Sequence, residues 1–503
     1  MKTYRLLVCS LLAGPAISLL ASSYVGAQLS TEISLVAHLQ ERPPNPSPPR
    51  PTPATAKTTS ILIKPFFRIS QASSVSADRR AGSAEVAYNP DDNEYLIVWE
   101  SDGLTETKGI NDIYGQRISG ATYEPIGIGF RISSFSDNDR NHSANDPKVV
   151  YNRTSHEYLV AWHGSGLFDG PAGFFEIYGQ RLSRAGKEIE GDFQISHLTE
   201  LGKINTSFVR SNSQVDVAWN STSNEYLVIW KGMGEPDDVV KMEIYGQRLK
   251  ANGELLGKHF RISHTTAQGD NFHANAPAIA YDSRDNQYLV VWSGGFKQES
   301  HTEVWGRGLS SSGTALGTED FRISQVGSAN RRSSSPQLAY NSANNEFLVV
   351  FQANPLPGDA RANANEILGQ RVNATKLGEA EPTSLRISNV TGVGTRVSEP
   401  QITYNSFDKE YLVLWRSARA KEPSEIWAQR LGASGADIEG DFQISNIGAI
   451  GQDRTINDAA LTNNSTNGQY VVVWQGNALA GADGLKRHEI FGQQLVPARP
   501  PVK

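Results

Sequence analysis

The stretch Glu243-Ile-Tyr-Gly-Gln-Arg-Leu249 decides the fold, because versions of it occur seven times along the 503-residue chain. Self-similarity at a regular spacing is the signature of repeat architectures, so it is interpreted before any local feature. The other copies begin at Asp112, Glu176, Glu303, Glu366, Glu425 and Glu489.

Three further patterns accompany each copy. One is Phe67-Arg-Ile-Ser70, which recurs at Phe130, Phe193, Phe260, Phe321, Leu385 and Phe442. Another is Glu94-Tyr-Leu-Ile-Val-Trp99, whose final aromatic recurs at Trp162, Trp230, Trp292, Phe351, Trp415 and Trp474. A short apolar run, such as Pro277–Tyr281 or Pro400–Tyr404, lies between them. All are short, rich in β-branched and aromatic residues and bounded by turn formers, so each predicts a strand.

These patterns predict an all-β protein, a seven-bladed β-propeller with four antiparallel strands per blade. The Tyr-Leu-Val-Val-Trp type of run is apolar at consecutive positions, which indicates a strand buried on both faces by neighbouring sheets. We assign the apolar run to the inner strand, the tryptophan run to the second, the Gly-Gln-Arg segment to the third and the Phe-Arg-Ile-Ser segment to the outer strand. The terminal tryptophans are then expected in the core.

The order of the patterns also predicts how the ring closes. The chain begins with an outer strand at Phe67 and ends with a third strand near Leu495, so the last blade lacks an outer strand of its own. We expect the N-terminal strand to complete that blade, because an exposed sheet edge would invite aggregation. The predicted organisation is a signal peptide at 1–27, a proline-rich linker at 28–64, the propeller at 65–496 and a C-terminal tail at 497–503.

The N-terminal sequence predicts export. Lys2 and Arg5 precede an apolar run from Leu6 to Leu20 and a small-residue cleavage site at Val25–Ala27, the pattern of a secretory signal peptide. The single cysteine, Cys9, lies inside this segment. We expect a periplasmic, extracellular or cell-surface monomer with no membrane span after signal removal. The net charge of −6 argues against a nucleic-acid partner.

The units resemble repeats of exported bacterial proteins that read roughly valine-valine-tryptophan, isoleucine-tyrosine-glycine-glutamine-arginine and phenylalanine. The resemblance covers residues 65–496 and is specific at the Gly-Gln-Arg segment, but it weakens at Gly306–Gly308 and Gly492–Gln494. Such proteins are propeller-like or tandem-repeat surface proteins, mostly of unassigned function. The resemblance therefore implies a fold and export, and no activity.

Strand alternation predicts that the outer-to-inner and second-to-third connections emerge on one side. These connections are the longer ones, for example residues 134–146, 197–213 and 163–175, and rigid scaffolds tend to carry function on such loops. A basic residue or histidine precedes every inner strand. We expect these to ring the channel mouth and to bind carboxylate or sulfate, because guanidinium forks bind such groups in a bidentate manner. They are Arg80, His142, Arg210, His273, Arg332, Arg396 and Arg454.

A structural alternative stays open for this ring, because each third strand begins with an acid, from Asp112 to Glu489. The bases and acids would then form ion pairs between blades. The outer-strand arginines, such as Arg68 and Arg131, are expected to be rim charges, and the Gln-Arg pair of the third strand an inter-blade contact. Residues Asp137–Ser143 match a calcium loop only in part, lacking its glycine and terminal acid, so no metal and no cofactor is predicted.

The functional hypothesis is a secreted or surface-displayed, non-catalytic binding module for an acidic polysaccharide or a cell-surface protein. No nucleophile elbow, zinc-binding His-Glu-x-x-His motif or phosphate loop occurs in the sequence. Two alternatives stay open. One is a glycan-active hydrolase or lyase on the same face, since a catalytic carboxylate pair can come from separate blades. The other is a structural envelope protein.

Overall fold

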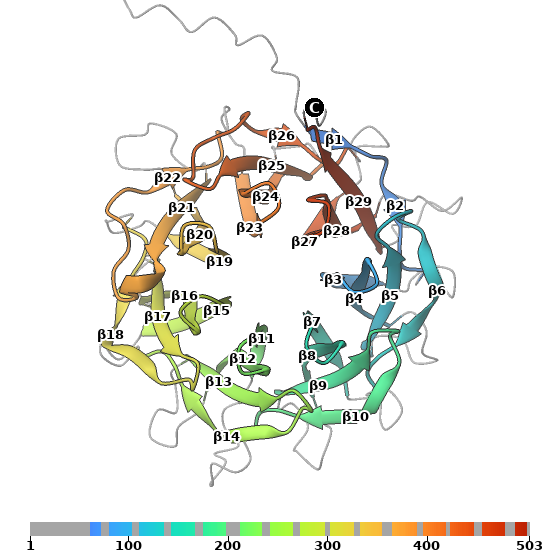
Figure 1. Ribbon diagram of the computed structural model, residues 1–503, viewed down its shortest axis with the longest axis horizontal. Coiled ribbons are helices and arrows are strands. Elements are labelled where there is room, and N and C mark those ends of the chain that lie inside the picture. The colour runs from blue at the N-terminus through green and yellow to red at the C-terminus, as the bar shows by residue number, and fades with distance from the viewer. Residues whose placement is uncertain are drawn as a thin grey trace, which may run out of the picture. The chain divides into compact units, whose positions relative to one another are not determined.

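The apolar runs form strands that pair in strictly antiparallel order. In the computed structural model, the described residues are 61–71, 80–102, 110–134, 142–165, 175–197, 212–233, 242–264, 272–296, 302–325, 332–354, 365–389, 396–418, 423–446, 455–477 and 488–499. Six sheets of four strands and one of five surround a common axis, with the inner strands nearest to it (Figure 1). The protein is a seven-bladed β-propeller, as the repeats predict.

Within blades 1 to 6, the order of the four strands along the chain is also their order from the axis outward. The inner strands are β3 (Ala81–Asn89), β7 (Ala144–Asn152), β11 (Ser213–Asn220), β15 (Phe272–Asp282), β19 (Ser333–Asn341), β23 (Arg396–Asn405) and β27 (Ile456–Asn463). The second strands are β4 (Glu94–Ser101), β8 (Glu157–Ser165), β12 (Glu225–Gly232), β16 (Gln287–Phe296), β20 (Glu346–Ala353), β24 (Glu410–Ala418) and β28 (Tyr470–Gly476). We number the blades 1 to 7 in this order.

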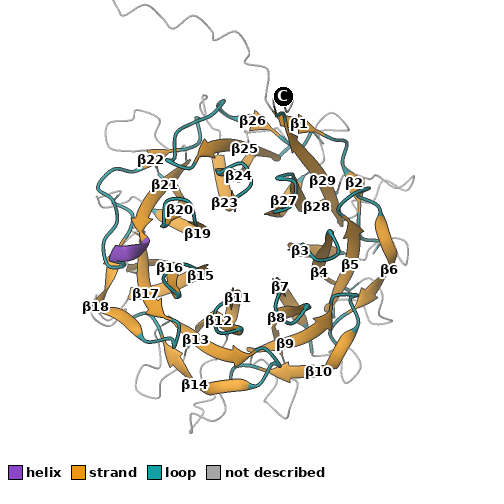
Figure 2. Cartoon of the chain, in the orientation of Figure 1, coloured by secondary structure: helices purple, strands orange, loops and turns teal. Residues whose placement is uncertain are grey.

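The third and outer strands complete each blade. The third strands are β5 (Asp112–Ser119), β9 (Phe175–Ser183), β13 (Glu243–Lys250), β17 (Thr302–Ser310), β21 (Glu366–Asn373), β25 (Glu425–Gly432) and β29 (Glu489–Pro497). The outer strands are β6 (Pro125–Arg131), β10 (Glu188–Gln194), β14 (Leu255–Arg261), β18 (Ala315–Arg322), β22 (Leu385–Arg386) and β26 (Phe442–Gln443). The helical content of the described residues is one short turn, η4 (Ala374–Lys376) (Figure 2).

Blade 7 receives its outer strand from the other end of the chain. Both β1 (Ile61–Ile63) and β2 (Phe67–Arg68) pair antiparallel with β29, with Ile61 opposite Pro497 and Phe67 opposite Gly492. Phe66 packs edge-on against Trp474 and Phe491, at ring-centroid distances of 6.1 and 5.7 Å. The sheet begins at Ile61, inside the segment 28–64 that the sequence assigns to a linker, because Ile61 is a buried core residue.

The core lies between blades, and the second strand contributes to two core layers at once. Leu96 and Val98 of β4 pack with Trp162 of blade 2, while Ile97 and Trp99 pack with residues of blade 7. This explains the consecutive apolar positions, because alternate side chains of a strand point to opposite faces. The terminal tryptophans are core residues as predicted, with exposures of 5% or less.

The acid that begins each third strand closes its own blade. The outer-strand serine donates its hydroxyl to this acid, as Ser133 does to Asp112 (2.8 Å) and Ser388 to Glu366 (2.5 Å). Outer-strand arginines add ion pairs, for example between Arg386 and Glu366 (2.6 Å). These arginines are therefore not merely rim charges, and the acids link the third and outer strands of one blade.

The arginine of the third-strand Gln-Arg pair makes the predicted inter-blade contact, whereas the glutamine donates its hydrogen bonds within its own blade. Arg117 pairs with Glu94 of its own blade (2.6 Å) and donates a hydrogen bond to the carbonyl of Ala185 in blade 2 (3.2 Å). Arg181 repeats this geometry toward Asn252 in blade 3 (3.0 Å). These contacts lie near the face that carries the tight connections, which we call the turn face.

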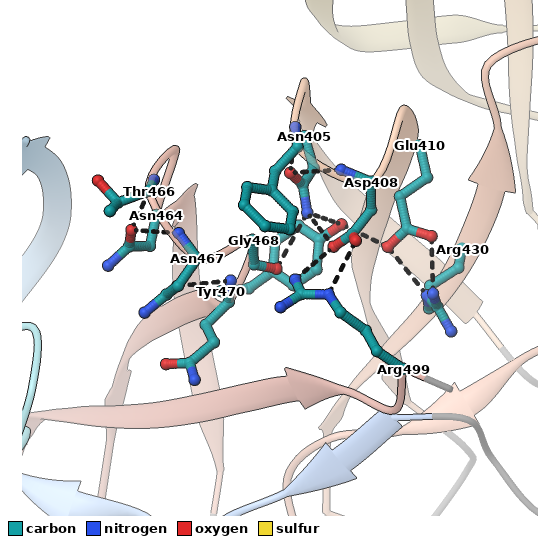
Figure 3. A network of polar contacts seen from close by, with 12 residues as sticks. Asn405, Asp408, Glu410, Arg430, Asn464, Thr466, Asn467, Gly468, Tyr470 and Arg499 are labelled. Carbon is teal, nitrogen blue, oxygen red and sulfur yellow. Dashed lines mark hydrogen bonds and ion pairs between the residues drawn. The ribbon is translucent and has the colours of Figure 1, made fainter. Parts of the chain in front are cut away.

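The turn face repeats one motif in every blade. An asparagine or aspartate at the end of the inner strand accepts hydrogen bonds from the backbone N–H groups two and three residues later, as Asn405 does from Phe407 (3.0 Å) and Asp408 (3.3 Å). Figure 3 shows this turn beside its counterpart at Asn464. Arg499 donates two hydrogen bonds to Asp408, at 2.9 and 2.7 Å, and so ties the end of the described chain to blade 6.

Candidate functional site

A cavity of about 250 Å³ lies on the axis, where the inner strands begin. The second strands end on the same side, so we call this side the loop face; the connections there include residues outside the described ranges. All seven blades line the cavity, which we call the axial pocket. Its lining residues are Ser83, Ala84, Glu85, Asp146, Pro147, Lys148, Gln214, Val215, Ala276, Pro277, Ser335, Pro336, Gln337, Glu399, Pro400, Gln401, Asp458 and Ala459.

A β-bulge in each inner strand shapes this pocket. The register between β3 and β4 shifts between Gly82 and Glu85, and the other inner strands shift at the same place. One residue of each bulge is a non-glycine residue with positive φ, between 39° and 55°. Such a conformation costs of order 1–3 kcal/mol for a side-chain-bearing residue. The residues are Ser83, Asp146, Gln214, Ala276, Ser335, Glu399 and Asp458.

Hydrogen bonds between blades offset part of this strain. The bulge turns its backbone N–H toward the preceding blade, where a side chain accepts it. Asp146 donates to Glu100 (2.9 Å), Ala276 donates to Gln214 (2.9 Å), and Ser335 donates to Ser293 (3.0 Å). The bulges therefore join neighbouring blades as well as lining the pocket.

The charges of the pocket break the sevenfold symmetry. Blades 1, 2, 6 and 7 contribute Glu85, Asp146, Glu399 and Asp458, and Lys148 of blade 2 forms an ion pair with Glu85. Blades 4 and 5 contribute alanine, serine, proline and glutamine. The lining thus holds four acids against one lysine, so the pocket itself repels anions.

The residue that follows the repeated terminal aromatic sits beside the bulges. Arg416 contacts Glu399 (2.7 Å) and Asn457 of the next blade (3.0 Å), and His163 lies 3.6 Å from Asp146. This position differs in almost every blade although its neighbours are repeated. The residues are Glu100, His163, Lys231, Ser293, Gln352, Arg416 and Gln475.

Burial changes the acidity of several of these groups. It raises the pKa of Glu100 to about 7, and the charges of Asp146 and Asp458 add to that rise against the hydrogen bond from the Asp146 backbone. Burial likewise raises the pKa of Asp216 to about 6, opposed by Lys148. It lowers the pKa of His163, opposed by Asp146. A carboxyl that titrates near neutrality beside a pocket is a feature of many functional sites.

The predicted basic ring lies outside the axial pocket wherever the structure describes it. Arg80, Arg332 and Arg396 are exposed. The backbones of Arg80 and Arg332 bridge to His488 and Thr302, at the start of the preceding blade's third strand, rather than facing the axis.

The remaining members of the ring are two histidines and two undescribed arginines. His142 is partly buried, and Nδ1 of His273 accepts a hydrogen bond from the Met242 backbone (3.2 Å). Arg210 and Arg454 lie outside the described residues, as does most of Asp137–Ser143. The structure thus brings three exposed guanidinium groups to the loop face, around a pocket of opposite charge.

Within the described residues, no group of three or more histidine, cysteine or acidic side chains has the geometry of a metal site. In the same part of the chain, no helix is long and apolar enough to cross a membrane.

Comparisons with known proteins add little beyond the architecture. No protein-family model and no curated protein sequence matches the chain. Similar solved structures include polysaccharide lyase Uly1, with a TM-score of 0.47, 10% identity and coverage of 88% of this chain and 99% of that one. The Hadza microbial sialidase Hz136 has a TM-score of 0.42, 11% identity and coverage of 86% and 68%. NanB sialidase from Streptococcus pneumoniae has a TM-score of 0.41, 10% identity and coverage of 86% and 70%. At these values the similarity assigns no activity.

Proposed function

We propose that this protein is an exported, non-catalytic binding module that holds an acidic polysaccharide across its loop face. The observation that carries the proposal is the contrast between the two faces. The turn face repeats one hydrogen-bonded turn in every blade, while the loop face varies in charge from blade to blade around the axial pocket. Symmetry that is broken on one face of a rigid scaffold supports recognition there. The signal-like N-terminus supports export.

The charge distribution supports an anionic ligand held away from the axis. Arg80 and Arg396 are exposed on the loop face, and neither forms an ion pair with an acid among the described residues. A guanidinium group binds a carboxylate or sulfate through two parallel hydrogen bonds. The acids of the axial pocket would repel the same ligand groups, so the polymer would cross the face over the arginines.

We expect the double variant Arg80→Gln/Arg396→Gln to bind acidic polysaccharides about tenfold more weakly. Exposed ion pairs contribute up to roughly 1 kcal/mol each, and two such contacts account for this loss. A glycan array at two salt concentrations, followed by titration of the hits, measures the effect. The matched control is Arg153→Gln/Arg184→Gln, which removes two exposed arginines of the turn face. Equal losses in both double variants, or no loss in the first, would contradict the proposal, and a blank array would favour a protein partner.

A glycan-cleaving function is the second candidate, and Glu100 is the observation that favours it. Its raised pKa keeps a carboxyl protonated at mildly acidic pH, as a general acid requires, and Asp146 places a second carboxyl group in the same region. On this hypothesis Glu100→Gln abolishes turnover of a bound polysaccharide and leaves its binding intact. The exposed acid Glu188, changed to Gln, is the control.

Glu100 also predicts a pH dependence of stability that does not require a substrate. Because the folded-state pKa is raised from 4.5 to about 7, the proton on Glu100 stabilises the fold fully below pH 4.5, and this stabilisation is lost as the pH rises through about 7. We therefore expect Glu100→Gln to gain stability relative to the unmodified protein between pH 5 and pH 8. Thermal unfolding of both proteins across this range measures the difference, and a constant difference would disprove the assignment.

A further inference from the structure

One position of the blade differs in blade 1 from every other blade. In blade 1, Phe130 of the outer strand pairs with Gly115, the central glycine of the third strand. The position in question is the residue immediately before Phe130 and its equivalent in the other blades. The other six blades carry a side chain here: Asp192, His259, Asp320, Ser384, Asp441 and Phe66. Blade 1 carries Gly129.

In blades 3 and 7 this side chain covers the aromatic pair formed by the second and third strands. The ring of His259 lies 6.4 Å from both Trp230 and Tyr245, measured between centroids. Phe66 takes the same place over Trp474 and Phe491. In blade 5, the hydroxyl of Ser384 donates a hydrogen bond to Oε1 of Gln370 (2.8 Å). The position therefore supplies a ring against the aromatic pair in blades 3 and 7 and a hydroxyl to the glutamine in blade 5. In blades 2, 4 and 6 it is an aspartate that accepts a hydrogen bond from a backbone N–H of the preceding blade.

Blade 1 has an unfilled space at this place. A cavity of about 250 Å³ lies between β2 and the outer half of blade 1, with Trp99 and Tyr114 among its lining residues. The two rings stack with a centroid distance of 6.4 Å and an interplanar angle of 26°. Trp99 is 5% exposed, against 2% or less for the second-strand tryptophans of the other blades. We call this cavity the seam pocket.

The seam pocket also presents a hydrogen-bond acceptor, Oε1 of Gln116, that the described residues do not use. Gln116 is 4% exposed, and its Nε2 donates hydrogen bonds to the carbonyls of Arg117 (2.9 Å) and Ile126 (3.3 Å). Its Oε1 lies 3.5 Å from where a Cβ on Gly129 would be, and it accepts no hydrogen bond from the described residues. Its counterpart in Gln370 accepts a hydrogen bond from Ser384, whereas the counterparts in Gln180, Gln429 and Gln493 are buried and accept none from the described residues. In blade 1 the oxygen differs by facing a cavity. A ligand hydroxyl in the pocket can therefore donate to this oxygen.

We propose that the seam pocket binds one pyranose ring of a glycan, with the apolar face of the sugar against Trp99, the more exposed ring of the pair, and a sugar hydroxyl donated to Gln116. The sugar combines in one molecule what His259 and Ser384 supply separately in blades 3 and 5. Ser101 and Arg68 line the same pocket, where Ser101 donates a hydrogen bond to the Arg80 carbonyl (2.7 Å) and Arg68 pairs with Glu489 (2.6 Å). The volume lies at the lower end of the range for small-ligand sites, which suits a single ring. The site is separate from the axial pocket and does not depend on it.

Filling the pocket tests the proposal. Gly129→His reproduces the arrangement of blade 3, where the aromatic pair is also Trp and Tyr. A Cβ at Gly129 meets no atom closer than 3.5 Å, so the backbone tolerates the change. The control is Gly191→His on the outer strand of blade 2, where a Cβ meets nothing within 4 Å. Equal unfolding midpoints establish that both variants are folded.

The probes are glucose, galactose, N-acetylglucosamine and glucuronate, titrated calorimetrically into the full protein. We expect at least one sugar to bind, Gly129→His to weaken it at least tenfold, and Gly191→His to change it less than twofold. Gly129→Ser, whose hydroxyl can satisfy Gln116, is expected to weaken binding to a smaller extent and serves if the histidine variant is unstable. Preference for the neutral sugars would assign recognition to hydroxyls, and a salt-sensitive preference for glucuronate would assign it to Arg68. Absence of binding by all four sugars, or unchanged affinity in both Gly129 variants, would overturn the proposal.

Discussion

Deleting residues 1–71 is expected to produce a protein that aggregates, whereas deleting residues 1–56 is expected to leave the propeller folded. The longer deletion removes β1 and β2, and with them the side chains of Phe66 and Phe67 from the core of blade 7. It also removes Arg68 and Ser70, the partners of the fully buried Glu489. The edge of β29 would then be open to pairing with another chain.

Size-exclusion chromatography and thermal unfolding of the two deletions measure this effect. The shorter deletion is the matched control, because the compact unit of the chain begins at Lys57. A monomeric longer deletion that unfolds at the same temperature as the control would show that β1 and β2 are dispensable. Ser70→Ala, which leaves both strands in place, is expected to lower stability without causing aggregation.

Replacing Arg430 with alanine is expected to destabilise the protein by about 3–5 kcal/mol, the usual cost of breaking a buried ion pair. Arg430 donates hydrogen bonds to both carboxylate oxygens of Glu410, at 3.1 and 2.7 Å (Figure 3). The two side chains are only 8% and 4% exposed. Tyr470 of blade 7 donates to the same carboxylate (2.7 Å), so loss of the arginine would disturb the contact between blades 6 and 7.

Chemical denaturation of two further variants separates the buried charge from the loss of packing. Arg430 also pairs with the buried carboxylate of Glu439 (3.2 Å). The triple variant Arg430→Met/Glu410→Gln/Glu439→Gln removes all three charges and is expected to recover most of the stability, since no buried carboxylate is left without its cation. Arg499→Gln breaks an exposed pair with Asp408 in the same region and is expected to cost less than about 1 kcal/mol. If Arg430→Ala costs no more than Arg499→Gln, the buried pair has no special role.

The architecture could be predicted because the same strand patterns recur in all seven blades. Each blade repeats a doubly buried strand that ends in an aromatic and a Gly-Gln-Arg strand, so divergence at Gly306–Gly308 does not obscure the pattern. The inter-blade role of Arg117 could be predicted for the same reason. Repetition is informative about packing, because every blade has to meet the same neighbours.

The candidate site could not be predicted in the same way. The axial pocket depends on bulges that place Ser83 and Asp146 at positive φ, and neither residue type requires that conformation. Ion pairs between the repeated acids and the basic ring were one alternative, but among the described residues the serine three positions after the start of the Phe-Arg-Ile-Ser motif binds these acids. One signal was available: the variable residue after each terminal aromatic, such as Glu100 or Arg416, in an otherwise repeated strand. The missing side chain at Gly129 can be recognised as an exception only when the blades are aligned by the register of their strands.

Joining the two ends of the chain in one sheet has a consequence for biosynthesis. Arg68 and Glu489 are separated by 421 residues, yet they belong to the same blade. At roughly 5–20 residues per second, a ribosome needs on the order of 20–80 s to make the intervening chain. The strands β1 and β2 therefore have no partner until β29 has been synthesised, so the ring cannot close on a nascent chain. A protein built in this way can be kept open until synthesis ends, which suits transport across a membrane before folding.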